Sequence, residues 1–230
     1  MSDVFEAPAA TRAAVSDGRQ FPVRRVFCIG RNYAAHAREM GSDPDRDPPF
    51  FFTKWAEAVV PSGTTIAYPP ETADFHYEAE LVVAIGKGGR NIAAGDAAAH
   101  ILGYAAGLDM TRRDLQQAAK EKGRPWDTAK NVEQSAPLGV IHPRTAVMAA
   151  GAIALTVNGE VRQQGDIADM IWPGDDVLAY VSRVSRLEPG DLIYTGTPSG
   201  VGAVAEGDEI VVTIDGLSPC TVRIGAPARD

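Results

Sequence analysis

Two carboxylates lead into an apolar run near the middle of the chain. Glu78 and Glu80 come directly before residues 81–85 (Leu-Val-Val-Ala-Ile), whose composition is typical of a buried strand. Residues two apart on an extended chain point to one face, which separates these two side chains by roughly 7 Å. Like charges beside a core cost free energy unless a cation lies between them. The pattern indicates a bound divalent cation, and a solvated edge strand is the alternative.

A third carboxylate, Asp109, stands in the otherwise apolar segment 107–110 (Gly-Leu-Asp-Met). Spacing alone does not connect Asp109 to the glutamates, and a helix-entry residue is the other interpretation. Three carboxylates without His or Cys suit a hard cation, Mg²⁺ before Mn²⁺ or Ca²⁺.

A histidine with an orienting carboxylate is the arrangement that activates water as a nucleophile. His36 and Glu39 are three apart in the predicted helix 34–41, so they share one face of it. A surface pair at this spacing is the alternative. His76, just before Glu78, is a candidate for contact with a metal ligand without itself binding the metal.

Several polar residues could hold an anionic substrate. Taken singly, each cation among them is a solvated surface charge, and together they suit a carboxylate. The Gly-rich segment 195–202 lacks the sequence of a phosphate-binding P-loop, but its N–H groups and Thr197 could hold a carboxylate. A tight sheet turn is the alternative there. The candidate cations are Arg31, Lys54, Arg113 and Lys130.

The predicted elements are short strands and few helices, without regular βαβ alternation. This predicts an α+β fold, a mixed β-sandwich roll, with a loose arm over residues 1–20 and a catalytic domain over 21–230. An Asn-Gly pair at 158–159 predicts a hairpin. Further strands are expected at 25–29, 49–54, 65–68, 191–195, 209–214 and 220–224, and helices at 96–106, 111–122 and 175–185, with loops at 42–49 and 126–131.

Composition narrows the class of protein. The net charge is −8 and no basic cluster exists, which argues against nucleic-acid binding. No apolar run reaches the length of a membrane span, and no signal-like segment opens the chain. Two distant cysteines, Cys28 and Cys220, suggest reduced thiols. We therefore expect a cytoplasmic protein without nucleic-acid or membrane partners.

Several motifs, in this order along the chain, resemble the fumarylacetoacetate hydrolase superfamily. The matching segments are 31–40 (Arg-Asn-Tyr-Ala-Ala-His-Ala-Arg-Glu-Met), 78–81, 108–116, 126–130, 158–160 and 195–202. Each motif is weak to moderate alone, but jointly they are specific. The chain resembles the short, single-domain members, and residues 48–54 and the opening arm are most similar to the bacterial members that hydrolyse fumarylpyruvate.

The resemblance implies roles for the candidate residues. It implies Mg²⁺, or Mn²⁺ with Ca²⁺ as a substitute, held by Glu78, Glu80 and Asp109 in a homodimer. It also implies a water-activating dyad on a lid and a lysine facing the bound ketone. The implied catalytic residues are His36, Glu39 and Lys130, and the implied substrate contacts are Arg31, Lys54, Arg113, Gln116 and Thr197.

The activity that the resemblance implies is hydrolysis of a carbon–carbon bond in a ketonic substrate. The expected substrate is a small anionic 2,4-diketo acid, 3-fumarylpyruvate, cleaved to fumarate and pyruvate. Alternatives within the family are acylpyruvase, oxaloacetate decarboxylase and 2-hydroxyhepta-2,4-diene-1,7-dioate isomerase activity. An inactive ligand-binding protein of the same fold is an alternative of a different class.

Overall fold

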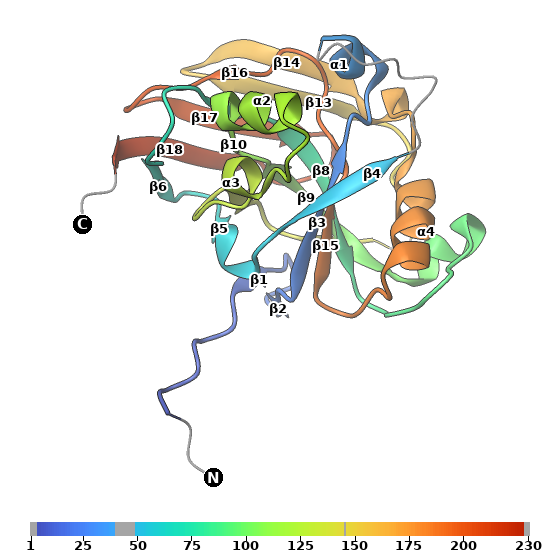
Figure 1. The fold of residues 1–230 in the computed structure, drawn as a ribbon. Helices are drawn as coiled ribbons and strands as arrows, with labels where there is room; N and C mark the ends of the chain where they lie inside the picture. Colours follow the sequence, from blue (N-terminus) through green and yellow to red (C-terminus); the bar gives the residue numbers. More distant parts are fainter. Residues whose placement is uncertain (1–3, 40–48, 145, 228–230) are drawn as a thin grey trace.

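Two curved β-sheets form the body of the protein (Figure 1). The computed structural model describes residues 4–39, 49–144 and 146–227. The larger sheet has the order β4-β3-β15-β8-β9-β11-β5, with β12 paired to β9. Its strands are β3 (Arg25–Gly30), β4 (Phe50–Lys54), β5 (Val59–Pro61), β8 (Ala79–Ile85), β9 (Ile101–Leu108), β11 (Ala136–Leu138), β12 (His142–Pro143) and β15 (Asp191–Tyr194).

A second sheet packs against the larger one, and two small sheets complete the fold. The second sheet, in the order β14-β13-β17-β18-β6, comprises β6 (Thr65–Tyr68), β13 (Ala152–Val157), β14 (Glu160–Asp166), β17 (Glu209–Ile214) and β18 (Cys220–Pro227). The small sheets comprise β7 (Phe75–Tyr77), β10 (Thr111–Arg112) and β16 (Gly202–Ala203), and the pair β1 (Arg12–Ala14) and β2 (Gln20–Pro22).

The helices are short and lie outside the sheets (Figure 1). None of those in the described residues has the length and apolarity needed to cross a membrane. They are α1 (Ala34–Glu39), α2 (Arg113–Glu121), α3 (Asp127–Lys130) and α4 (Gly174–Val184), with the 3₁₀ turns η1 (Ala56–Ala58), η2 (Ala94–Ala99) and η3 (Ile167–Asp169). The predicted α+β roll with few short helices is therefore confirmed.

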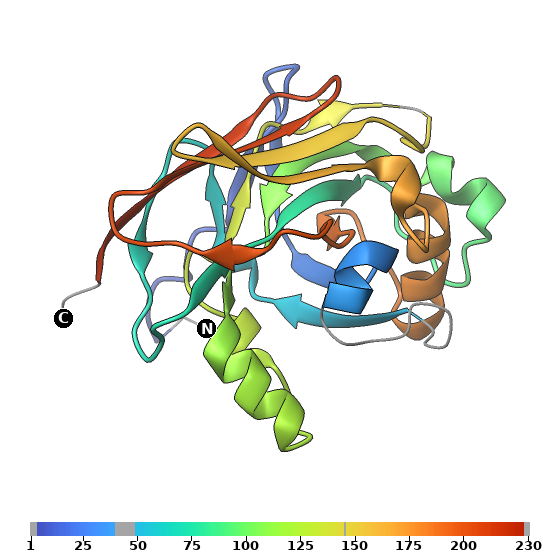
Figure 2. The same cartoon turned by 90° about the horizontal axis from the view of Figure 1, so that it is seen from above.

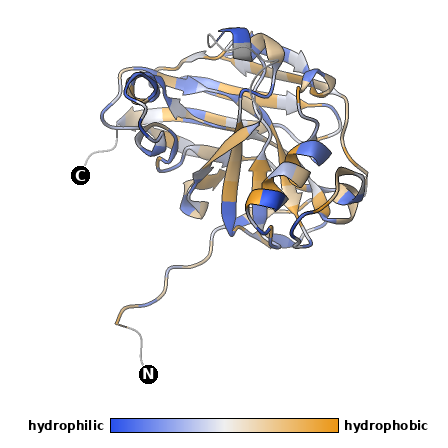
Figure 3. Ribbon diagram, turned by 45° about the vertical axis from the view of Figure 1, so that its right-hand side comes forward, coloured by the Kyte–Doolittle hydropathy of each residue, from blue (hydrophilic) through white to orange (hydrophobic). Residues whose placement is uncertain are grey.

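Strand β8 is buried on both faces, as its aliphatic run predicts. Leu81, Val83 and Ile85 face the core between the two main sheets. Val82 and Ala84 face a second core on the opposite side of the larger sheet. Apolar residues accordingly concentrate on the central strands in Figure 3. The strand that carries Glu80 is thus held rigidly, which fixes the position of its carboxylate.

Residues 96–106 do not form the predicted helix, and that prediction was wrong. Only η2 is helical there, and β9 follows as a buried strand. The small residues of β9 allow close packing of neighbouring segments. A Cβ on Gly103 would lie 2.1 Å from the His142 carbonyl oxygen, and one on Gly107 would lie 2.6 Å from Val82 Cγ2.

Other predictions differ in smaller ways. β1 pairs with β2, and Ala13 and Val15 are buried, so ordered structure begins inside the segment predicted as a loose arm. The predicted 126–131 loop contains the short helix α3. The Asn158-Gly159 hairpin is confirmed, with positive φ of 52° and 82°. Most of the predicted 42–49 loop lies outside the described residues.

Candidate active site

The pairing of β8 with β9 brings the three carboxylates together. Ala79 lies opposite Leu108, and the Asp109 N–H donates to the Glu78 carbonyl at 2.9 Å. Asp109 therefore follows β9 at the point where Glu78 precedes β8. One ligand atom from each of Glu78, Glu80 and Asp109 lies within 4.8 Å of the others, and all three residues are buried. The connection of Asp109 to the glutamates, which spacing left open, comes from this register.

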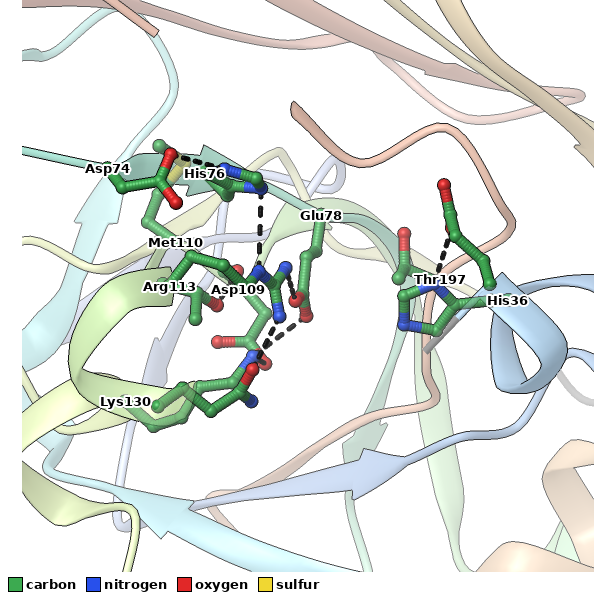
Figure 4. Close-up of polar contacts among 12 residues, drawn as sticks. His36, Asp74, His76, Glu78, Asp109, Met110, Arg113, Lys130 and Thr197 are labelled. Carbon is green, nitrogen blue, oxygen red and sulfur yellow. Dashed lines mark hydrogen bonds and ion pairs between the residues drawn. The ribbon is translucent and has the colours of Figure 1, made fainter. Parts of the chain in front are cut away.

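Lys130 bridges two of the carboxylates (Figure 4). Its Nζ donates to Glu78 Oε2 and Asp109 Oδ2, each at 2.8 Å. Its ammonium also lies 4.9 Å from the centre of the Phe52 ring. Burial opposes the charge on Lys130, but Asp109 and Glu78 outweigh it and raise the lysine pKa. The side chain at the end of α3 is therefore a charged group that faces the carboxylates.

Lys54 lies behind Asp109, outside the set of pocket-lining residues. Its Nζ donates to the Met110 carbonyl at 3.0 Å, to Ser135 Oγ at 2.8 Å and to the Lys130 carbonyl. It also lies 2.9 Å from Asp109 Oδ1. The geometry of Lys54 differs from the predicted substrate contact, because its ammonium is already hydrogen-bonded to backbone carbonyls next to Asp109 and at Lys130. Lys54 holds these two residues in place.

The donor set fits a hard divalent cation. Glu80 accepts a hydrogen bond from the Gly196 N–H at 2.8 Å but forms no ion pair with a described residue. Burial, Asp109 and Glu78 together raise the pKa of Glu80 well above its usual range. Asp109 Oδ1 accepts no hydrogen bond among the described residues, although Lys54 lies nearby. A buried carboxylate without a cation and an oxygen with free lone pairs are what an oxygen-binding metal ion requires.

A chain of polar side chains fixes Glu78 from the other side. Arg113 at the start of α2 donates to Glu78 Oε1 and, at 2.6 Å, to Gln116 Oε1. His76 accepts from Arg113 Nε at 3.4 Å, and its other nitrogen lies 2.7 Å from Asp74 (Figure 4). Burial disfavours ionisation of Glu78, but Lys130 and Arg113 outweigh it and lower its pKa. His76 thus lies beyond the ligands, as its place in the sequence suggested.

His36 lies on α1, across the site from Glu78 and Lys130, together with Thr197 (Figure 4). Its Nδ1 lies 3.1 Å from Glu39 Oε2. Burial lowers the pKa of His36, against opposing effects of Glu78 and Glu39. When Nδ1 donates to Glu39, Nε2 is left without a proton. The imidazole is therefore a base whose orientation Glu39 sets.

The loop after β15 supports both α1 and Thr197. The Gly200 N–H donates to the Glu39 carboxylate at 3.2 and 3.3 Å, and α1 lies beside this loop in Figure 2. Gln163 donates to Thr197 Oγ1 and the Pro198 carbonyl, each at 2.8 Å, and accepts from the Ala79 N–H at 2.9 Å. Gln163 was not among the predicted site residues, since it gives no signal in the hairpin sequence.

A pocket lies between these groups. Arg31 lines this pocket together with the predicted residues on both sides of the site. Five further lining residues were not predicted, namely Ile29, Gly30, Phe52, Lys120 and Trp126. A signal for Lys120 existed, because it follows Gln116 by four residues and Arg113 by seven on the same helix face. The predicted lining residues are Arg31, His36, Glu78, Glu80, Asp109, Arg113, Gln116, Lys130 and Thr197.

The chain belongs to the fumarylacetoacetate hydrolase family. Residues 25–225 match the family described as fumarylacetoacetate (FAA) hydrolase C-terminal. The match includes the carboxylate triad, the histidine helix and nearly all of the two main sheets, but not the β1–β2 pair.

Relatives within the family include fumarylpyruvate hydrolases. The chain is 48% identical over 189 residues to a fumarylpyruvate hydrolase of Ralstonia sp., covering 81% of this chain and 98% of the relative. A crystal structure of fumarylpyruvate hydrolase from Pseudomonas aeruginosa, in complex with Mn²⁺ and pyruvate, is 50% identical with a TM-score of 0.95, covering 98% of this chain and 100% of that one. The human mitochondrial oxaloacetate tautomerase FAHD1 is 41% identical over 206 residues, covering 89% of this chain and 93% of the relative.

Proposed function

We propose that the protein hydrolyses the carbon–carbon bond of a 2,4-diketo acid, 3-fumarylpyruvate, to fumarate and pyruvate. The observation that carries the proposal is a buried carboxylate triad facing a Glu39-oriented His36 across one pocket. The first group of residues is suited to a metal ion, and the second to activation of water. The similarity to fumarylpyruvate hydrolases at 48% and 50% identity supports this substrate.

Glu78, Glu80 and Asp109 would hold the metal ion, Mg²⁺ or Mn²⁺. When bound, the ion supplies Lewis-acid polarisation of the carboxylate and 2-oxo oxygens of the substrate. The Mn²⁺ and pyruvate in the Pseudomonas aeruginosa relative support binding of the substrate by its pyruvate end. We extend the proposal to a homodimer located in the cytoplasm.

His36 takes a proton from the attacking water. With Nδ1 held by Glu39, Nε2 accepts the proton as the water oxygen adds to the C4 carbonyl of the substrate. The bond between C3 and C4 then breaks, and its electron pair stays on the pyruvate fragment as an enolate. Return of the proton to C3 gives pyruvate, while C4 becomes the carboxylate of fumarate. One water is consumed, and the second proton of that water leaves the new carboxylic acid to solvent, so that atoms and charge balance.

The cations of the pocket stabilise and position the anionic substrate. Lys130 is charged and buried, so its ammonium can stabilise negative charge on a substrate oxygen more strongly than a solvated lysine could. Arg113 and Gln116 are linked to each other and line the same pocket, where with Arg31 and Thr197 they can hold a carboxylate. We assign these four residues to substrate binding.

A substrate panel tests the proposed function. The protein is incubated with Mg²⁺ and, separately, 3-fumarylpyruvate, acetylpyruvate, oxaloacetate and 2-hydroxyhepta-2,4-diene-1,7-dioate, and the products are quantified. We expect the highest kcat/KM with fumarylpyruvate, and equal amounts of fumarate and pyruvate. Dominant loss of CO₂ from oxaloacetate, isomerisation of the dienoate, or no turnover of any substrate would contradict the proposal. A fall of activity with EDTA and its recovery with Mg²⁺ or Mn²⁺ test the metal requirement.

A further inference from the structure

Lys120 is a pocket cation that the catalytic machinery leaves unused. The other buried ammonium groups are engaged: Lys54 contacts Asp109, and Lys130 bridges Glu78 and Asp109. Lys120 lines the same pocket but forms no ion pair with any residue in the described part of the chain. Its side chain is half-buried, so this lysine is not a fully solvated surface charge.

Its place on α2 separates it from the carboxylate triad. Arg113, Gln116 and Lys120 lie on one face of the helix, and the first two are already bonded to one another beside Glu78. Seven residues of helix advance the chain by roughly 10 Å, so the backbone of Lys120 lies about two turns beyond that of Arg113. A substrate held at the triad by its pyruvate end would reach Lys120 only with its distal end.

Aromatic rings border this outer part of the pocket. The Lys120 ammonium lies 5.4 Å from the centre of the Trp126 ring, and Trp126 packs against Phe52 at 5.8 Å and Phe50 at 5.4 Å. Trp126 and Phe52 both line the pocket. The ring of Trp126 holds the ammonium in place, and the two rings offer flat apolar surface to an unsaturated chain.

The electrostatics of this wall favour an incoming anion. Burial, together with the like charges of Arg113 and Arg31, lowers the pKa of Lys120 to about 8. These unfavourable effects would be relieved by a negative group at the ammonium. A carboxylate placed there gains a charge-assisted hydrogen bond, whereas a methyl group gains none.

We propose that Lys120 is the specificity-determining residue that binds the distal carboxylate of a dicarboxylic diketo acid, with Trp126 as its support. This inference rests on the proposed function for the orientation of the substrate. It explains how the pocket can favour a fumaryl group over a neutral acyl group of similar size. Both kinds of substrate have the same pyruvate end, and both would be attacked through the same His36–Glu39 dyad. Neither feature can therefore discriminate between them.

Binding of two matched ligands tests the proposal without turnover. Heptanedioate bearing a 2-oxo group has the same seven carbons as fumarylpyruvate but lacks the 4-oxo group that hydrolysis requires. Its partner, 2-oxoheptanoate, lacks only the distal carboxylate. With Mn²⁺ present, calorimetry should show the wild type binding the dicarboxylate about 10- to 100-fold more tightly than the monocarboxylate. Lys120→Met should abolish most of this preference, and Lys120→Arg should retain part of it.

The matched control is Lys122→Met, which removes an exposed lysine two residues further on. This control should keep the wild-type preference. Lys120→Gln repeats the measurement with a polar side chain in case the methionine variant does not fold, as checked by thermal unfolding. An unchanged preference in a folded Lys120→Met or Lys120→Gln variant would overturn the proposal.

Kinetics provide a second readout. The ratio of kcat/KM for fumarylpyruvate to that for acetylpyruvate should fall about 10- to 100-fold in Lys120→Met, mainly through KM for fumarylpyruvate. A fall in kcat for both substrates by the same factor would indicate a structural effect and contradict the assignment. Failure of the proposed function is distinguishable, because it would appear as absent hydrolysis by the wild type, whatever the ligand preference of the variants.

Discussion

The Lys54 ammonium lies 2.9 Å from Oδ1 of Asp109, and neither side chain is more than 1% exposed. The same ammonium holds the carbonyls of Met110 and Lys130. One buried charge thus fixes both a candidate metal ligand and the segment that positions the lysine facing it. The relationship predicts that stability and metal binding are coupled at this point.

Replacement of Lys54 by Met should destabilise the metal-free protein by about 1–3 kcal/mol, because it removes one of the two ammonium groups beside the buried Asp109 and leaves the Met110 and Lys130 carbonyls without this donor. Mn²⁺ should then raise the unfolding temperature of the variant more than that of the wild type, since the ion supplies the missing positive charge. Thermal unfolding in EDTA and in Mn²⁺ measures both effects. Lys87→Met, at an exposed lysine, is the control, and an unchanged stability of Lys54→Met in EDTA would refute the coupling.

The Glu80 carboxylate should destabilise the metal-free protein and stabilise the metal-bound protein. Its raised pKa means that the folded state keeps the proton more tightly than the unfolded state, whose Glu pKa is about 4.3. The stabilisation by this proton is present below about pH 4.3 and is lost as the pH rises toward the folded-state pKa.

Glu80→Gln keeps an acceptor for the Gly196 N–H but removes the charge. In EDTA, the variant should therefore be more stable than the wild type at pH 8, with the difference shrinking toward pH 4. In Mn²⁺ the order should reverse, because the variant loses a ligand. Unfolding temperatures across pH in both buffers provide the test, and a variant less stable than the wild type in EDTA at pH 8 would argue against it.

The pH dependence of activity should report His36. A general base must be unprotonated, and burial lowers the His36 pKa, so the acidic limb of kcat/KM should fall below pH 6.5. Glu39 opposes this shift. Glu39→Gln should therefore move the acidic limb further toward low pH as well as reduce the rate, while its amide oxygen can still accept from the Gly200 N–H. A limb that stays in place or moves to higher pH would contradict the role of this pair.

Local sequence predicted the parts of the site that depend on local geometry. Glu78 and Glu80 share a face because they are two apart on an extended chain, and His36 and Glu39 meet because they are three apart on a helix. That these residues belong to one site was predicted from the family resemblance. The match over residues 25–225 confirms the family. The structure adds the register of β8 and β9, which carries Asp109 to the glutamates.

The parts that could not be predicted depend on packing between distant segments. Ile101–Leu108 is a strand whose two glycines allow the close approach of His142 and Val82, contacts that the local sequence does not reveal. Lys54 looks like any lysine at a strand end, and only its burial among carbonyls separates it from a substrate contact. Gln163 likewise acquires its role from three partners far away in the sequence.

The most direct test of the central claim is replacement of His36 by Asn, measured for hydrolysis and for metal binding in the same preparation. The release of fumarate and pyruvate from 3-fumarylpyruvate should fall about 10²- to 10⁴-fold, because the general base is lost. The Kd for Mn²⁺, from electron paramagnetic resonance, should stay at the wild-type value, since His36 is not one of the three carboxylate ligands. Hydrolysis at the wild-type rate by a variant with intact Mn²⁺ binding would contradict water activation by His36, and with it the proposed mechanism.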